Sequence, residues 1–167
     1  MRKGGGKAKG SAFERKIAKY IVRAFKGFGI TQRDCWRSVN SGGHEIAWGD
    51  LELSPKLEEL FPYVVECKFR RKIKWQHFLE RKPKSEEMNW IAQVLQDVNR
   101  ANRSLIPLLV MKENFGPIYV AIPADVSAKR VIEICKWTTF IKNVVRECTS
   151  HKGKPRGSKR SLSASRP

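Results

Sequence analysis

Glu66 and Lys68 stand at the end of the apolar run Tyr-Val-Val-Glu-Cys-Lys. Side chains along a strand alternate between its two faces, so these two residues point the same way while Val65 and Cys67 point towards packing. Asp50 lies upstream, in the sequence Trp-Gly-Asp. Carboxylates next to a lysine suit a divalent metal beside a cation, which is the arrangement that phosphodiester cleavage requires.

The chemistry of Mg²⁺ matches these residue types. Mg²⁺ prefers oxygen ligands and keeps several waters, so one or two carboxylates together with a substrate phosphate suffice. We expect Asp50 and Glu66 to be the carboxylates, helped by the backbone carbonyl of Cys67, with Mn²⁺ as a substitute metal. A bound metal lowers the pKa of its water and offsets transition-state charge. Lys68 would orient the attacking water or stabilise the developing charge.

The charge of the chain indicates its partner. There are 34 Lys and Arg residues against 16 Asp and Glu, a net charge of +18. Such an excess favours a polyanion, with nucleic acid the first candidate and an anionic membrane surface the second. A basic cluster directly follows the Glu-x-Lys strand, and we predict that it contacts the DNA backbone; its members are Arg70, Arg71, Lys72 and Lys74. Phosphate contacts of this kind are strongly salt dependent and carry no sequence information.

Other features narrow the class of protein. No stretch is long and apolar enough to span a bilayer, and the first residues lack the apolar core of a signal peptide. The four cysteines form no Cys-x-x-Cys pair, so we predict reduced thiols with no zinc site and no disulfide. These observations predict a cytoplasmic protein of a prokaryotic or phage-infected cell.

The first half of the chain predicts one helix and three strands. Apolar residues recur at helical spacing over residues 11–26, and Ser11 with Glu14 fits a capping box at its start. Residues 1–9, rich in Gly and Lys, are expected to be disordered. Residues 54–61 are expected to be a connection. The predicted strands cover residues 35–39, 48–53 and 63–68, with a flexible turn at 41–44.

The second half adds a helix, a hairpin and a segment whose pattern fits two kinds of element. One short amphipathic turn is predicted near Trp75, followed by a helix over residues 85–103. Residues 106–111 and 118–122 form a predicted hairpin. Residues 124–148 fit either a helix or, across 131–135, a strand. Together the elements predict an α/β domain with a mixed central sheet and helices on its faces. The domain covers 10–149, with a core at 10–123 and a C-terminal extension at 124–149, and a disordered basic tail covers 150–167.

The order of Glu14, Asp50, Glu66 and Lys68 resembles the PD-(D/E)XK nuclease superfamily. In that pattern a helix offers a Glu, an Asp lies on one strand, and (D/E)-x-K lies on the next strand, paired with it. The Asp element here is Gly-Asp rather than Pro-Asp. Within the superfamily the chain looks most like archaeal-type and phage-type Holliday junction resolvases, over roughly residues 9–123. The segments that carry this likeness are Lys9-Gly10-Ser11, Phe13-Glu14-Arg15, Arg37 with Ser41-Gly42, Val65-Glu66-Cys67-Lys68 and the hairpin with Pro107, Lys112 and Gly116.

The resemblance implies a restriction-endonuclease-like core and Mg²⁺-dependent cleavage of branched DNA, in particular four-way junctions, by a homodimer. It implies that Glu14 completes the metal shell, directly or through water, and that Gln93 points into the same cleft. Additional DNA contacts are assigned to Lys9, Arg15, Arg37 and Ser41. The two-fold interface of such a dimer would use an apolar surface of the second helix or of residues 131–145.

Other interpretations of the same residues stay open. Glu-x-Lys at a strand edge is often a solvated ion pair, and a capping box by itself explains Glu14. Gln93 fits an ordinary helix surface, and Ser41 fits a turn. The chain could be another PD-(D/E)XK nuclease, restriction-like or a recombination exonuclease. It could also be a non-catalytic basic protein that binds nucleic acid, in which the carboxylates serve only stability.

Overall fold

A mixed four-stranded sheet forms the centre of the computed structural model, which describes residues 5–38, 48–101, 104–123 and 132–151. Its strands lie in the order β3-β4-β5-β6. Strand β3 pairs with β4 in parallel, and the other two pairs are antiparallel, so the predicted mixed sheet is confirmed. The bounds are Tyr63–Arg70 for β3, Ile106–Glu113 for β4, Ile118–Pro123 for β5 and Ile132–Lys136 for β6.

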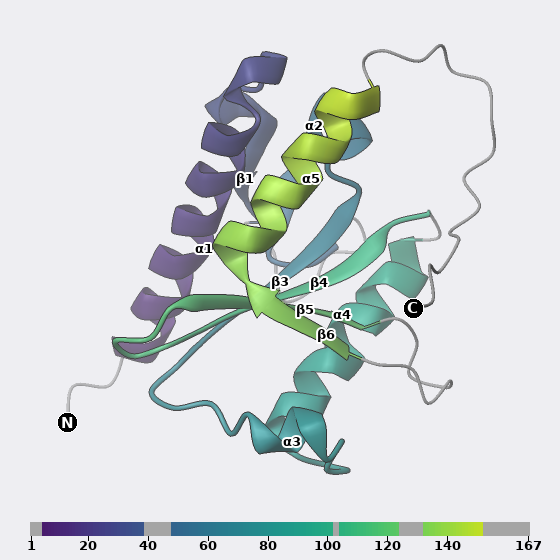
Figure 1. The fold of residues 1–167 in the computed structure, drawn as a ribbon. Coiled ribbons are helices and arrows are strands. Elements are labelled where there is room, and N and C mark those ends of the chain that lie inside the picture. The colour runs from purple at the N-terminus through teal and green to yellow at the C-terminus, as the bar shows by residue number, and fades with distance from the viewer. Residues whose placement is uncertain (1–4, 39–47, 102–103, 124–131, 152–167) are drawn as a thin grey trace.

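Helices cover both faces of this sheet (Figure 1). Helix α1 (Gly5–Ala24) and helix α5 (Trp137–His151) share one hydrophobic core with the sheet. Helix α4 (Glu86–Ala101) and the short α3 (Gln76–Leu79) form a second core on the opposite face. The α/β architecture with flanking helices agrees with the class predicted from the sequence.

A two-stranded antiparallel ribbon lies beside β3. Strand β1 (Cys35–Arg37) pairs with β2 (Leu51–Leu53). The amide of Asp50, just before β2, donates to the carbonyl of Val65 on β3 over 2.8 Å. The predicted pairing of the Asp element with the Glu-x-Lys strand is therefore made at one point rather than along a ladder.

Short helices occupy the connections before and after the two-stranded ribbon. The predicted connection at residues 54–61 contains helix α2 (Pro55–Leu60), whose first turn is capped by the hydroxyl of Ser54. Two 3₁₀ turns, η1 (Lys26–Phe28) and η2 (Gln32–Asp34), link α1 to β1. The 3₁₀ turns thus connect α1 to the ribbon, and α2 connects the ribbon to β3.

The predicted start of the first helix is wrong. Helix α1 begins at Gly5, so residues 5–9 are helical rather than disordered, and Ser11 and Glu14 lie inside the helix. The capping box is therefore also wrong. Burial of Phe13 and Ile17 against the sheet stabilises the helix, and this packing outweighs the low helix propensity of the early glycines. Glu14 is consequently free of the helix end and available to another partner.

The segment at residues 124–148 contains both of the elements that its pattern allowed. Strand β6 covers most of the predicted strand, and α5 follows it directly. The apolar sides of α5 and α4 are buried inside the protomer, with Trp137 and Phe140 in one core and Trp90 and Val94 in the other. The two-fold interface stays a prediction, and the apolar residues of these helices that pack on the sheet do not contribute to it.

None of the four cysteines forms a disulfide; Cys35 and Cys67 are buried, and Cys135 and Cys148 are half-buried. Among the described residues, no helix has the length and hydrophobicity needed to cross a bilayer.

Candidate active site

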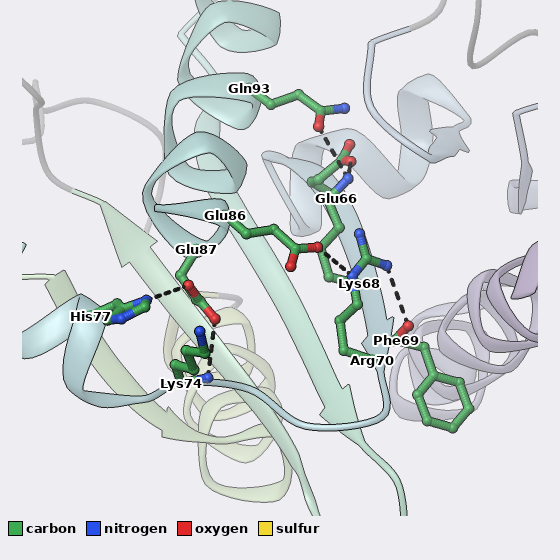
Figure 2. Close-up of polar contacts among 9 residues, drawn as sticks. All are labelled: Glu66, Lys68, Phe69, Arg70, Lys74, His77, Glu86, Glu87 and Gln93. Atoms are coloured by element: carbon green, nitrogen blue, oxygen red, sulfur yellow. Dashed lines mark hydrogen bonds and ion pairs between the residues drawn. The ribbon is translucent and has the colours of Figure 1, made fainter. Parts of the chain in front are cut away.

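Glu66 and Lys68 lie on the face of β3 that α4 covers (Figure 2). The Lys68 ammonium forms a short ion pair with Glu66 and also donates to the side-chain oxygen of Gln93 over 3.0 Å. Val65 and Cys67 point into the core beneath α1. The alternation predicted from the sequence is confirmed. Because Glu66 is only 2% exposed, its ion pair with Lys68 is not a solvated surface contact.

Gly49 lets the chain bring Asp50 against β3. Its φ of +75° is left-handed, and a Cβ atom there would lie 2.6 Å from the carbonyl oxygen of Val65. Only glycine tolerates both conditions. The Asp50 amide then donates to Val65, and the Asp50 carboxylate accepts the Cys67 amide over 2.8 Å. These two hydrogen bonds hold Asp50 against β3, the strand that carries Glu66.

Substitution of Gly49 by alanine should therefore damage both the fold and the site. The left-handed φ and the collision with the Val65 carbonyl together should lower the free energy of unfolding by about 1–3 kcal/mol. Urea unfolding measures this change. Gly27→Ala is the matched control, because a Cβ atom at Gly27 meets no atom within 4 Å. Equal stability of the two variants would contradict the assigned role of Gly49.

One stripe of α4 faces the functional side of β3. Its members are spaced by about one helical turn and are Glu86, Trp90, Gln93 and Asp97. Arg70 of β3 pairs with Glu86 over 2.7 Å and lies over the ring of Trp90 at 5.1 Å. Gln93 bonds Lys68. The stripe thus descends along the strand from Arg70 towards Glu66, with Asp97 one turn beyond Gln93.

Asp97 was missed by the sequence analysis. It is half-buried, and its charge acts on both Asp50 and Glu66. Burial raises the pKa of Asp97, while Arg100 and Lys68 act in the opposite direction. A single Asp on an amphipathic helix carries no motif. Its spacing of four residues from Gln93 is the signal that would have found it.

The acids of the site are poorly neutralised. Burial raises the pKa of Glu66 to about 7, and the negative charge of Asp50 adds to the shift against the opposing effect of Lys68. Burial also raises the pKa of Asp50 to about 6; the Cys67 amide lowers it, and Glu14 raises it. Several carboxylates share essentially one lysine, so an additional cation would stabilise their ionised forms.

The donor set fits Mg²⁺ that arrives with a phosphate. Two carboxylates, of Asp50 and Glu66, lie next to the backbone of Cys67, and hard oxygen donors are what Mg²⁺ prefers. Within the described ranges, no three His, Cys, Asp or Glu side chains form a ready-made metal cage. Mg²⁺ does not need one, because waters and substrate oxygens complete its shell.

Glu14 has a partner of its own. Its carboxylate forms a short ion pair with Arg37, which ties α1 to β1. The field of Glu14 still reaches Asp50, as the raised pKa of Asp50 records. The structure therefore places Glu14 and Arg37 beside the acids, and a contribution of Glu14 to the metal shell stays a prediction.

The remaining predicted DNA contacts lie around one end of β3. Lys9 of α1 lies over the ring of Phe69 at 5.6 Å. Arg15 is exposed on α1, and Arg71, Lys72 and Lys74 are exposed after β3. Ser41 lies outside the described residues. Arg70, the last residue of β3, is held by α4 through its side chain, whereas Arg71, Lys72 and Lys74 are exposed to solvent.

The loop of residues 71–75, called the basic loop below, follows β3 and carries Arg71, Lys72 and Lys74. The buried carboxylate of Glu87 holds this loop to α4 (Figure 2). Glu87 accepts the Lys74 amide over 3.0 Å and contacts the His77 ring nitrogen at 2.7 Å. Burial by itself would raise the pKa of Glu87, but these hydrogen bonds outweigh it and the pKa is lowered. Sequence analysis missed this pair, because neither residue belongs to a motif.

A mixed sheet has helices on both faces, its edge strand β3 carries Glu66 and Lys68, and Asp50 is hydrogen-bonded to that strand. These features define a restriction-endonuclease-like core of the PD-(D/E)XK superfamily. Residues 5–153 match the family described as "Phage putative PDDEXK endonuclease"; the chain belongs to this family and is a nuclease. The match includes the C-terminal extension that the sequence resemblance left unplaced. No curated protein and no solved structure matches the chain.

Proposed function

We propose that the chain is a Mg²⁺-dependent, structure-selective endodeoxyribonuclease that hydrolyses phosphodiester bonds in branched DNA, with four-way junctions as its preferred substrate. The observation that supports the proposal is the closeness of three groups: the Asp50 carboxylate accepts the amide of Cys67, which stands between Glu66 and Lys68 on β3, and Glu66 and Lys68 form an ion pair. The basic loop continues directly from that strand. A nuclease site and a phosphate-binding surface thus form one continuous region.

Each residue of the site has a distinct task. A Mg²⁺ ion would polarise the scissile phosphate and lower the pKa of a coordinated water. Asp50 and Glu66 offer it oxygens, and the hydrogen bond from the Cys67 amide orients the Asp50 carboxylate. The Lys68 ammonium then donates to a phosphate oxygen or to the attacking water. Gln93, which already bonds the Lys68 ammonium, would keep it in place if Glu66 served as a metal ligand.

The preference for branched DNA rests on the resemblance to junction resolvases together with the charge of the surface. Basic loops bind phosphates of any duplex, so selectivity must come from the shape of the DNA. Two strands of a junction must be cut, and a two-fold dimer supplies two sites. We infer a homodimer whose interface lies away from the apolar sides of α4 and α5, since these are buried within the protomer.

Cleavage of a synthetic four-way junction beside a linear duplex of the same sequence tests this function. We expect Mg²⁺ or Mn²⁺ to support cuts at defined internal positions of the junction, EDTA to abolish them, and the duplex to be cut at least about tenfold more slowly. Equal cutting of both substrates would indicate a restriction-like nuclease, and shortening from DNA ends would indicate an exonuclease. Tight binding of the junction by the intact protein with no cleavage would contradict the catalytic assignment.

A further inference from the structure

Phe115 occupies the tip of the β4–β5 hairpin with its side chain fully exposed (105%). The Gly116 amide donates to the Glu113 carbonyl over 3.2 Å, so residues 113–116 form a tight turn with Phe115 in its third position. The φ of Phe115 is +60°. This turn position normally takes Gly or Asn, and a bulky side chain with positive φ is a strained exception that often marks a functional site.

The turn is held firmly against the basic loop. The Asn114 amide donates to the Arg70 carbonyl over 3.1 Å, and the Glu113 carboxylate accepts the Ile73 amide over 3.1 Å. The Lys112 ammonium also bonds the Gly116 carbonyl. Because both ends of the turn are tied down, the exposed ring is presented on a fixed base and not on a loose loop.

Cationic side chains lie around the base of the turn that carries Phe115. Lys112, which bonds the Gly116 carbonyl, lies over the ring of a second aromatic residue, Phe69, at 6.0 Å, and Lys9 lies over the same Phe69 ring at 5.6 Å. Lys9 comes from the first turns of α1. Arg71 and Lys72 are exposed in the adjoining loop. An aromatic ring among exposed cations suits a polyanion that also offers flat apolar faces, which describes DNA with an accessible base.

The hairpin tip lies within reach of the strand being cut. Lys68 is paired in register with Met111 on β4, four residues before Phe115. At about 3.3 Å per residue the ring lies on the order of 13 Å from the level of Lys68. Duplex DNA advances about 3.4 Å per nucleotide, so this offset corresponds to about four nucleotides.

We propose that Phe115 stacks on a base exposed at the branch point and so selects branched DNA over continuous duplex. This inference rests on the proposed function. Every base has a face that an aromatic ring can cover, so stacking requires no particular sequence. In continuous duplex both faces of each base are already stacked, and insertion of a ring would first have to separate two base pairs. At a branch point that separation is already made.

Phe115→Asn tests the proposal, because Asn tolerates the left-handed φ but has no ring. Binding is measured in EDTA, with a labelled junction and with a linear duplex, and 2-aminopurine at the branch reports stacking. We expect junction affinity to fall about 5- to 100-fold, duplex affinity to change little, and the 2-aminopurine signal on binding to disappear. Phe115→Trp should restore both junction affinity and signal. The melting temperature of Phe115→Asn should be unchanged or higher, because strain is removed.

Leu79→Asn is the matched control, since Leu79 is also strongly exposed (81%) but lies on α3 and not on the hairpin. It should bind both DNAs like the wild type. Unchanged junction binding by Phe115→Asn, an equal loss on junction and duplex, or failure of the Trp variant to restore binding would each overturn the proposal. Since binding is measured without metal, absence of cleavage by the wild type would count against the proposed function and not against the role of Phe115.

Discussion

Replacement of Lys68 by alanine should slow Mg²⁺-dependent cleavage of a junction by about a hundred- to a thousandfold, the usual effect of removing one preorganised donor from a transition state. Lys68 is held between Glu66 and Gln93, so its ammonium is already placed before substrate arrives. Single-turnover rates at saturating protein measure the effect, because they separate chemistry from binding and product release.

Lys142→Ala provides the charge-matched control for this variant. Lys142 is exposed on α5, on the face of the sheet opposite α4, and its removal lowers the net charge by the same amount. We expect Lys142→Ala to cleave at the wild-type rate. Junction binding in EDTA should change less than about tenfold in either variant, since one cation among many phosphate contacts is lost. A Lys68→Ala protein that cleaved normally would remove Lys68 from the active site.

Asp50→Asn should abolish cleavage and at the same time stabilise the metal-free protein. The carboxylate is lost as a metal ligand, but Asn can still accept the Cys67 amide. Burial and neighbouring acids raise the pKa of Asp50 to about 6, so its ionised form is unfavourable in the folded protein. At about pH 7.5 we expect the substitution to raise the free energy of unfolding by roughly 1–3 kcal/mol.

The pH dependence of this gain in the free energy of unfolding follows from the direction of the carboxyl pKa shifts. A carboxyl whose pKa is raised on folding binds more protons in the folded state, so stability falls as pH rises from its unfolded pKa through its folded pKa. For Asp50 this pH range runs from 3.8 to about 6, and for Glu66 it runs from 4.5 to about 7. The advantage of Asp50→Asn should be small near pH 4 and should grow up to about pH 7.

Urea unfolding in EDTA at several pH values measures that advantage. Glu86→Gln, at an exposed acid that pairs with Arg70, is the control and should show no comparable growth with pH. Addition of Mn²⁺ should stabilise the wild type more than Asp50→Asn, since ligands that bind only the folded state raise its stability. A difference between wild type and Asp50→Asn that stayed constant with pH would contradict the burial of this charge.

The chemistry of β3 was predictable because it depends on a local rule. Alternation along a strand fixes that Glu66 and Lys68 share a face whatever surrounds them. Asp50 was predicted only by its order in the pattern, and its placement depends on Gly49, which lets two backbones approach. A glycine at that position in the sequence looks like any turn residue, so the close approach could not be foreseen.

Long-range packing explains the features that were missed. The early glycines of α1 indicate a disordered start, but burial of its apolar side extends the helix to Gly5. Asp97 and Glu87 lie on an ordinary amphipathic helix, and only the packing of α4 in the fold brings Asp97 close to Lys68 and brings Glu87 to Lys74 and His77. The left-handed turn at Phe115 is similarly invisible, since Gly116 beside it is the residue that sequence rules would place there.

The way Glu87 holds the basic loop has a consequence for how this nuclease could be tuned. The anchor uses the backbone amide of Lys74 and the ring of His77, not the cationic side chains. The lysines and arginines on the outer side of that loop can therefore vary in number without loosening its path. Salt tolerance and turnover on DNA could be adjusted by surface charge alone, while the geometry around the scissile bond is preserved.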